Sequence, residues 1–152
     1  MARFEIARSA DIAAPRERVH ALIDDFHAWT KWSPWEDVDP ALRRTYAGAE
    51  RGVGARYGWS GNRRAGAGSM AIAASSPEQV LVDLSFTKPV KARNDLAFDL
   101  AESDRGTRVT WTMRGENRGV AAIFWRIFPM ERELGKQFEQ GLAQLKAAAE
   151  TP

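Results

Sequence analysis

The sequence of 152 residues contains no cysteine and only two histidines. The absence of cysteine excludes disulfides, thiolate nucleophiles and cysteine-held metal or iron–sulfur sites. The chain also lacks a long apolar run, because its longest strongly apolar stretch, residues 120–128, contains Arg126 and is far shorter than the roughly 20 residues that span a bilayer. At the N-terminus, Arg3 and Glu5 stand where a signal peptide would need its apolar core. These features favour a soluble, cytoplasmic protein.

Several kinds of catalytic and cofactor site have little support in the residues present. His20 and His27 lie seven residues apart, about 10 Å along a straight helix, which is too far to share one metal ion. With both histidines near the first predicted helices and no cysteine, we find no nucleophilic triad. The glycine-containing stretches 52–54 and 66–68 lack the continuation of a dinucleotide-binding fingerprint into a helix. We therefore expect neither a metal nor an organic cofactor.

The charge of the chain does not indicate a nucleic-acid partner. The formal net charge is only +2, although arginines are concentrated in the first half of the sequence. A nucleic-acid footprint would need these arginines on one continuous face, and solvated hairpin edges are the simpler explanation for them. The length corresponds to a single domain, residues 1–152, and the unusual feature of its composition is the six tryptophans and seven phenylalanines.

Residues 131–149 carry the only long helical pattern in the chain. Their apolar residues recur at spacings of four, four and three, which places them along one stripe of an α-helix: Leu134, Phe138, Leu142 and Leu145. Full burial of each such side chain is worth about 1.5 to 3 kcal/mol. The helix therefore needs a broad partner surface, and we expect that surface to be a sheet.

The first part of the chain predicts one strand and two helices. Apolar and polar residues alternate over residues 4–12, as in a half-buried strand. Arg8 falls on the apolar side of this alternation, so we expect a bulge or a strand end there. Pro15 suits the first turn of a helix, which we expect over residues 15–25. A spacing of three then brings three aromatic residues together on a short second helix: Phe26, Trp29 and Trp32.

From Leu42 onward, alternating segments separated by turns predict consecutive hairpin-linked strands. The apolar alternation assigns the following residues to the inner face of the sheet: Tyr57, Trp59, Met70, Ile72, Val80, Val82, Leu84, Phe86, Leu96, Phe98, Leu100, Val109, Trp111 and Met113. The predicted fold class is α+β. We expect a curved antiparallel sheet of six or seven strands wrapped around the long C-terminal helix, with two short helices after the first strand.

Particular stretches of the sequence carry a family resemblance. They are residues 12–15 with Val19, Trp32-Ser33-Pro34-Trp35, residues 52–55 leading to Tyr57 and Trp59, Lys88-Pro89, residues 106–111 and residues 138–146. With the order of elements, they resemble the START-like, Bet v 1-like superfamily (SRPBCC), which has a helix-grip fold. Within it the chain is similar to the polyketide cyclase/dehydrase and lipid-transport-like group, which is related to activators of the Hsp90 ATPase.

The resemblance implies an apolar cavity between the sheet and the C-terminal helix. Small residues on that helix, Gly135, Gly141 and Ala148, would leave room for a ligand. The predicted ligand-binding residues are Trp32, Trp35, Trp59, Phe86, Phe98, Trp111, Phe124 and Phe138. Plain core packing accounts for the same aromatic residues. The apolar residues 120–128, separated from the helix by Pro129, are a candidate gate at the cavity mouth.

Three functional hypotheses follow from these patterns. The leading one is a carrier or sensor that binds a small hydrophobic molecule such as a lipid, a polyketide or an aromatic metabolite, because the inner set contains no carboxylate, histidine or lysine. The second is a cyclase/dehydrase-type enzyme in which Tyr57, Asn94 or Glu36 assists proton transfer. The third is a protein-interaction module. We expect a monomer or homodimer with neither a nucleic-acid partner nor an integral membrane segment.

Overall fold

A computed structural model describes residues 2–36, 39–63, 65–117, 119, 122–123, 127 and 129–151. The elements are strand β1 (Ala2–Ile12), helix α1 (Arg16–Ile23), the 3-10 helix η1 (Ala28–Lys31), strands β2 (Arg43–Gly48), β3 (Ala55–Ser60), β4 (Ala67–Ser76), β5 (Gln79–Lys88), β6 (Ala92–Ser103) and β7 (Gly106–Asn117), and helix α3 (Met130–Glu150). The strands form one antiparallel sheet in the order β1-β7-β6-β5-β4-β3-β2. The predicted α+β helix-grip architecture is therefore confirmed.

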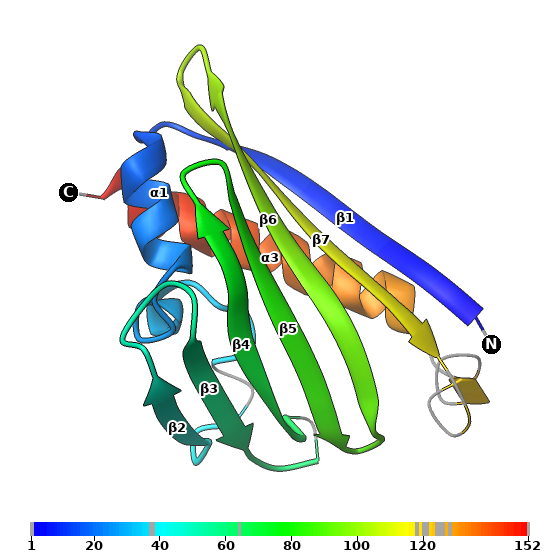
Figure 1. Ribbon diagram of the computed structural model, residues 1–152. Helices are drawn as coiled ribbons and strands as arrows, with labels where there is room; N and C mark the ends of the chain where they lie inside the picture. Colours follow the sequence, from blue (N-terminus) through cyan, green and yellow to red (C-terminus); the bar gives the residue numbers. More distant parts are fainter. Residues whose placement is uncertain are drawn as a thin grey trace.

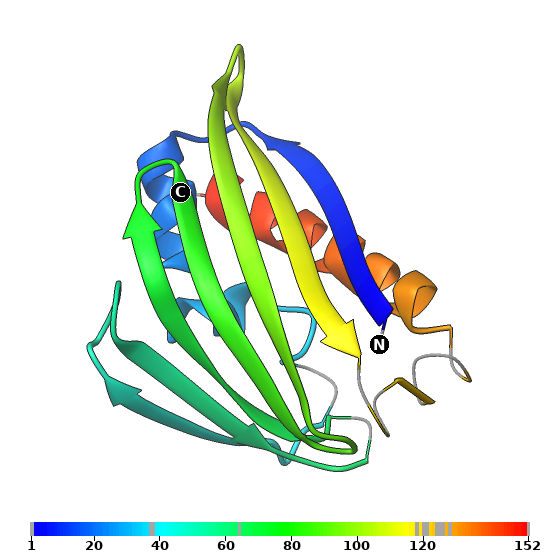
Figure 2. The same cartoon turned by 45° about the vertical axis from the view of Figure 1, so that its right-hand side comes forward.

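The sheet curves around α3, which lies across its concave face (Figures 1 and 2). The predicted stripe of α3 is buried against this face, with Phe138 and Leu145 fully enclosed. Helix α1 lies beside the C-terminal end of α3 (Figure 1). The sequence places α3 well, because Pro129 precedes it and two acidic residues, Glu131 and Glu133, stand in its first turn, where the helix dipole favours them.

The helices of the first part differ in detail from the sequence prediction. Helix α1 is shorter than the expected residues 15–25, and Pro15 is its N-cap. The second helix is the 3-10 helix η1, which contains only Trp29 of the three expected aromatic residues, while Phe26 precedes it and Trp32 is its C-cap. The expected contacts are present, since the ring centroids of Phe26 and Trp29 are 5.4 Å apart and those of Trp29 and Trp32 are 4.6 Å apart.

The expected bulge at Arg8 is wrong. Strand β1 pairs with β7 residue for residue, and Arg8 lies opposite Trp111 in that register. The side chain of Arg8 points inward and crosses α3 at Gly135, where an added Cβ would lie 2.2 Å from Nη2 of Arg8. Nε of Arg8 also donates to Oε1 of Glu139 on the same helix at 3.2 Å. An arginine on the apolar side of this strand thus fastens the strand to the helix.

Opposite charges face each other on the outer side of β1 and β7. Three pairs stand directly across the two strands: Arg3 with Glu116, Glu5 with Arg114, and Asp11 with Arg108. Cross-strand pairs of this kind stabilise a register by tenths of a kcal/mol up to about 1 kcal/mol each. They help to hold β1, the strand that closes the sheet at one edge.

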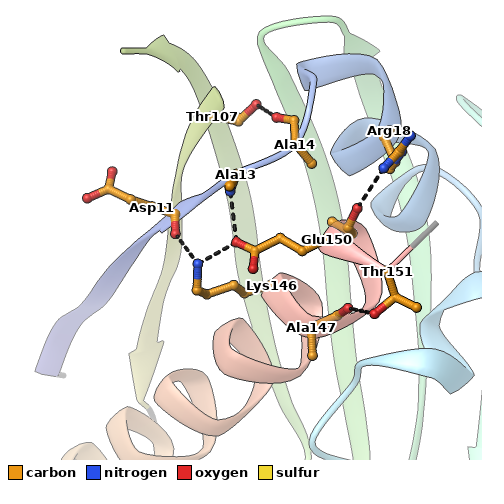
Figure 3. A network of polar contacts seen from close by, with 10 residues as sticks. Asp11, Ala13, Ala14, Arg18, Thr107, Lys146, Ala147, Glu150 and Thr151 are labelled. Atoms are coloured by element: carbon orange, nitrogen blue, oxygen red, sulfur yellow. Dashed lines mark hydrogen bonds and ion pairs between the residues drawn. The ribbon is translucent and has the colours of Figure 1, made fainter. Parts of the chain in front are cut away.

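A polar network fastens the C-terminal end of α3 to the segment between β1 and α1 (Figure 3). The ammonium group of Lys146 donates to Glu150 and to the carbonyl oxygen of Asp11, and Glu150 also accepts from the backbone N–H of Ala13 at 2.8 Å. The guanidinium of Arg18 donates to the carbonyl oxygen of Ala149 at 3.2 Å. These bonds satisfy one carbonyl at the helix end and fix the helix above the sheet.

Replacing Glu150 by glutamine is expected to lower the midpoint of thermal unfolding modestly at pH 7. The hydrogen bond from Lys146, followed by that from Ala13, lowers the pKa of Glu150. A carboxyl group with a lowered pKa stabilises the folded state above its unfolded pKa, and this contribution disappears as the pH falls through the folded pKa. Circular dichroism melts at pH 7 and at pH 3 should therefore differ for wild type and variant at the higher pH only. An equal deficit at both values would contradict a charge effect.

Candidate functional site

The deep part of the concave face is filled by aromatic rings. Four of the predicted ligand-binding residues lie here, each 1% exposed or less: Trp32, Phe98, Trp111 and Phe138. The ring of Trp111 stacks on Phe138 with centroids 4.1 Å apart and planes 6° apart, and on Phe98 with centroids 5.0 Å apart. These four residues, called the aromatic block below, join the sheet to α3. Their part in ligand binding stays a prediction.

The room expected beside the glycines of α3 is occupied by protein. A Cβ added to Gly141 would lie 2.8 Å from Trp111 and 2.8 Å from Pro34, and one added to Gly135 would meet Arg8. The prediction that these two glycines leave space for a ligand is therefore wrong. They instead let α3 approach the aromatic block and the β1 strand closely.

The inner face becomes more open at the end of the sheet formed by the last residues of β3 and β5. Trp59 and Phe86 point inward by register but are only half-buried. Trp59 lies over Gly68, where an added Cβ would be 2.6 Å from the indole ring, and packs edge-on against Phe86 with centroids 5.6 Å apart. Its indole N–H donates to the carbonyl oxygen of Ala65 at 2.9 Å. We call this part of the concave face the open end.

Trp35 connects the aromatic block with the loop that follows η1. Its half-buried ring packs edge-on against Trp111 and Phe138, with centroids 5.5 Å and 6.4 Å apart. Its indole N–H donates to Oε1 of Gln137 on α3 at 2.8 Å. Trp35 is therefore held in place from the helix side, and the next residue, Glu36, is positioned with it.

A buried polar cluster stands beside the open end. Glu36 is 8% exposed, and its Oε2 accepts from Nε of Arg44 at 2.5 Å. Nη2 of Arg44 donates to the backbone carbonyl of Glu36 at 3.2 Å, and the hydroxyl of Tyr57 donates to Oε1 of Glu36 at 3.4 Å. Two of the three predicted catalytic candidates, Tyr57 and Glu36, are thus brought together, although they are 21 positions apart in sequence.

The electrostatics of this cluster keep both tyrosines protonated at neutral pH. Burial, and then the negative charge of Glu36, raise the pKa of Tyr57 well above its usual value. The same two causes raise the pKa of Tyr46. Burial opposes the charge of Arg44, but the hydrogen bond and the charge of Glu36 raise its pKa overall. The cluster therefore offers a neutral phenol and a neutralised ion pair, not a free charge.

A stacked pair of rings, His27 and Tyr46, connects the polar cluster with the surface. The sequence did not predict this pair. The imidazole of His27 lies parallel to the ring of Tyr46, with centroids 4.0 Å apart and planes 16° apart. Nδ1 of His27 is 2.9 Å from Oδ1 of Asp25, and the ring centroids of Tyr46 and Tyr57 are 5.5 Å apart. The stack depends on how the loop before η1 meets β2, and no local periodicity records this.

The third catalytic candidate, Asn94, lies elsewhere on the concave face. It occupies the β6 position opposite Gly115, and its Oδ1 would be 2.3 Å from a Cβ on that glycine. Three strand spacings separate it from Tyr57, or about 14 Å along the sheet. Asn94 therefore does not join Glu36 and Tyr57 in one catalytic group.

A second polar group, not predicted from sequence, joins α1 to β4. Oγ of Ser75 donates to Oδ1 of Asp24 at 2.6 Å and lies 3.0 Å from Nε2 of His20. The residue types are those of a nucleophilic triad, but the serine hydroxyl proton points to the aspartate and not to the histidine. Because the hydroxyl donates to Asp24, His20 does not accept its proton, and the arrangement holds the end of the helix on the sheet.

Two predictions fall on residues that the structure does not describe. Phe124 is one of them, so its proposed place at a cavity mouth is untested. The candidate gate over residues 120–128 is described only at Ala122, Ile123 and Ile127, and both isoleucines are exposed. Within the described ranges, no helix is long and apolar enough to cross a membrane, and no three His, Asp or Glu side chains are placed to hold a metal ion.

Comparisons with solved structures show the same fold in several proteins. Protein CV1439 from Chromobacterium violaceum has 18% sequence identity and a TM-score of 0.70, over 97% of this chain and 98% of that one. The Aha1 dimer from Colwellia psychrerythraea has 16% identity and a TM-score of 0.67, over 97% of each chain. DynU16, described as a putative protein in the dynemicin biosynthetic locus, has 14% identity and a TM-score of 0.66, over 97% of this chain and 47% of that one.

Sequence comparison supplies the family. A search of curated proteins found no match. The family model described as polyketide cyclase / dehydrase and lipid transport matches residues 3–150, which is nearly the whole chain. The helix-grip fold agrees with that match. The chain therefore belongs to the polyketide cyclase/dehydrase and lipid transport family.

Proposed function

We propose that this protein binds a small, largely apolar molecule at the open end of its concave face and acts as a carrier or sensor. One observation carries the proposal. Trp59 and Phe86 point inward but remain half-buried, whereas Phe98 and Trp111, deeper on the same face, are fully buried. Large aromatic side chains that face inward without being covered are suited to take up an apolar ligand.

The polar cluster supports the proposal by providing a few fixed hydrogen-bonding groups beside apolar rings. Nη1 of Arg44 has no partner among the described residues, and the Arg44 side chain is 31% exposed. The Tyr57 hydroxyl is held at Glu36 by its hydrogen bond. Because Arg44 neutralises Glu36, an uncharged ligand meets no uncompensated charge at this place. Such a combination of rings and few oriented polar groups is typical of small-molecule sites.

Binding of N-phenyl-1-naphthylamine, a neutral apolar fluorophore, tests the proposal. We expect saturable 1:1 fluorescence enhancement with the wild type and about tenfold weaker binding for Trp59→Ala, because the loss of one aromatic contact is worth about 1 to 2 kcal/mol. The matched control is Val53→Ser, which changes an apolar side chain that is 60% exposed on the turn before β3. Absence of saturable binding, or equal affinity in Trp59→Ala and wild type, would refute the proposal.

A cyclase/dehydrase-type enzyme is the second candidate, and the pairing of Tyr57 with Glu36 favours it. A phenol whose pKa is raised stays protonated at neutral pH, so Tyr57 would act as a hydrogen-bond donor or general acid toward a substrate carbonyl. Turnover of an identified substrate should then fall about 100-fold or more in Tyr57→Phe. Unchanged turnover in both Tyr57→Phe and Glu36→Gln would exclude this role.

A further inference from the structure

Asn94 is a polar side chain buried on an otherwise apolar part of the concave face. It is 8% exposed, and its neighbours on β5 and β6 that face the same side, Leu84 and Leu96, are 1% exposed each. Its amide takes part in none of the hydrogen bonds found within the described residues. The amide atoms of Asn94 are not among the fully buried polar atoms without a partner, so the amide keeps a small contact with solvent. An amide that is mostly covered and has no protein partner is still less favourable than an apolar residue of the same size. A leucine would satisfy the packing here better than an asparagine.

The amide has space made for it. Gly115 lies directly opposite Asn94 on β7, and any Cβ at that position would collide with Oδ1 of Asn94 at 2.3 Å and with the ring of Phe4 at 2.8 Å. The missing side chain of Gly115 therefore leaves room for the amide oxygen of Asn94 beside β7, and no hydrogen bond to the amide is found among the described residues. An amide can make up to four hydrogen bonds.

Asn94 and Tyr57 lie in the same row across the sheet. Tyr57 pairs with Met70, Met70 with Leu84, and Leu84 with Asn94. The two polar residues thus stand at the ends of an apolar stretch about 14 Å long between their backbones. The two residues between them, Met70 and Leu84, are covered by protein, so a ligand that reaches both ends would lie along the neighbouring row. The neighbouring row, toward the open end, contains Trp59 and Phe86 with two small residues, Gly68 and Ala92, all of them half-buried.

We infer that Asn94 is a second polar anchor of the proposed binding site. The ligand is then a flat apolar molecule with a hydrogen-bonding group at each end, one end at Tyr57 and Arg44 and the other at Asn94. A lipid with a single polar head leaves one of the two anchors without a partner, so it fits this site less well. The inference rests on the proposed function, because it requires a ligand at the open end.

A matched pair of biphenyls tests the inference. The probes are 4,4′-dihydroxybiphenyl, with a hydroxyl at each end, and 4-hydroxybiphenyl, with one; dissociation constants are measured by isothermal titration calorimetry. In Asn94→Leu, we expect the dihydroxy compound to bind about tenfold more weakly and the monohydroxy compound to stay within about twofold of wild type. Asp95→Asn, an exposed change at the next position of the same strand, is the control and should leave both constants unchanged.

Thermal unfolding of the free protein separates a binding role from a structural one. If Asn94 has no partner within the protein, Asn94→Leu should raise the melting midpoint while it weakens dihydroxybiphenyl binding. Side-chain amide resonances of Asn94 in 15N-labelled protein should shift on addition of the dihydroxy compound. In Asn94→Ser, a smaller polar replacement, binding should fall between wild type and leucine.

The possible outcomes distinguish this inference from the function on which it rests. If neither biphenyl nor N-phenyl-1-naphthylamine binds, the proposed function fails together with the inference. If both biphenyls bind equally well to wild type and to Asn94→Leu, while Trp59→Ala weakens them, the site stands and the second anchor is refuted. A lower melting midpoint in Asn94→Leu, with unchanged affinities, would assign Asn94 a structural role and also overturn the inference.

Discussion

Replacing Trp111 by alanine is expected to lower the free energy of unfolding by about 3 to 5 kcal/mol, enough to unfold a marginally stable domain. Trp111 is fully buried and contacts the rings of Phe138, Phe98, Trp32 and Trp35. Its loss opens a cavity between the sheet and α3 and removes the ring that the other three residues of the aromatic block all contact. Urea denaturation followed by circular dichroism measures the change.

Two comparisons control for this effect. Trp59→Ala removes the same side chain at the open end, where it is half-buried, and should cost only about 1 to 2 kcal/mol. Trp111→Phe should also be mild, because the indole N–H of Trp111 has no hydrogen-bond partner in the part of the chain that the structure describes. Trp32→Phe should cost about 1 kcal/mol more than Trp111→Phe, since the N–H of Trp32 donates to the carbonyl oxygen of Leu22 at 2.7 Å. If Trp111→Ala and Trp59→Ala lowered the free energy of unfolding equally, the two side chains would not differ in burial as the structure describes.

Replacing Glu36 by alanine is expected to destabilise the protein by about 2 kcal/mol at pH 7. The change removes a buried carboxylate that accepts from Arg44 and Tyr57, and hydrogen bonds to charged groups contribute about 1.5 to 3 kcal/mol. The upper part of that range is not expected, because the Arg44 side chain is 31% exposed and can turn to water. Chemical denaturation of the single and double variants at Glu36 and Arg44 measures their coupling.

The exposed pair of Arg114 and Glu5 is a matched control. Nε and Oε2 are 2.6 Å apart there and 2.5 Å apart in the Arg44–Glu36 pair, but both control side chains are more than half exposed. Its coupling free energy should be about 0 to 1 kcal/mol. Equal coupling in the two pairs would show that burial of Glu36 does not strengthen its interactions.

The Glu36 variant should also change the titration of Tyr57. In the wild type the pKa of Tyr57 is raised by burial first and by the charge of Glu36 second, so Glu36→Ala should lower this pKa toward, but not to, its usual value of about 10. Stability from a raised tyrosine pKa is complete below pH 10 and is lost as the pH rises toward the folded pKa. Absorbance at 295 nm should therefore show Tyr57 ionising at lower pH in the variant. An unchanged titration would mean that the carboxylate does not act on this phenol.

Much of the architecture could be predicted because it depends on local periodicity. The stripe of Leu134, Phe138, Leu142 and Leu145 and the alternations in the strands specify which side of each element is apolar, and the structure buries those sides. The two errors at Arg8 and at the glycines of α3 have one cause. A side chain that crosses from a strand to a helix depends on a contact between residues far apart in sequence, here Arg8 over Gly135, and periodicity contains no such information.

The candidate site divides in the same way. From the sequence, the aromatic residues were predicted to bind a ligand, and Tyr57, Asn94 and Glu36 were the candidate polar residues of the site. Which of them are near one another was decided by strand register and by the loop after η1: Glu36 reaches Tyr57, whereas Asn94 stays three strands away.

By itself, then, the sequence determined the elements, the apolar face of each and the residue types that meet inside the molecule, because these follow from spacing along the chain. The tertiary structure decided how far those residues are covered. The rings around Trp111 are sealed where α3 comes close at Gly141, and Trp59 and Phe86 remain half-buried at the open end. Coverage depends on the distance between helix and sheet at each point, which is set by pairs of side chains brought together only when the chain folds.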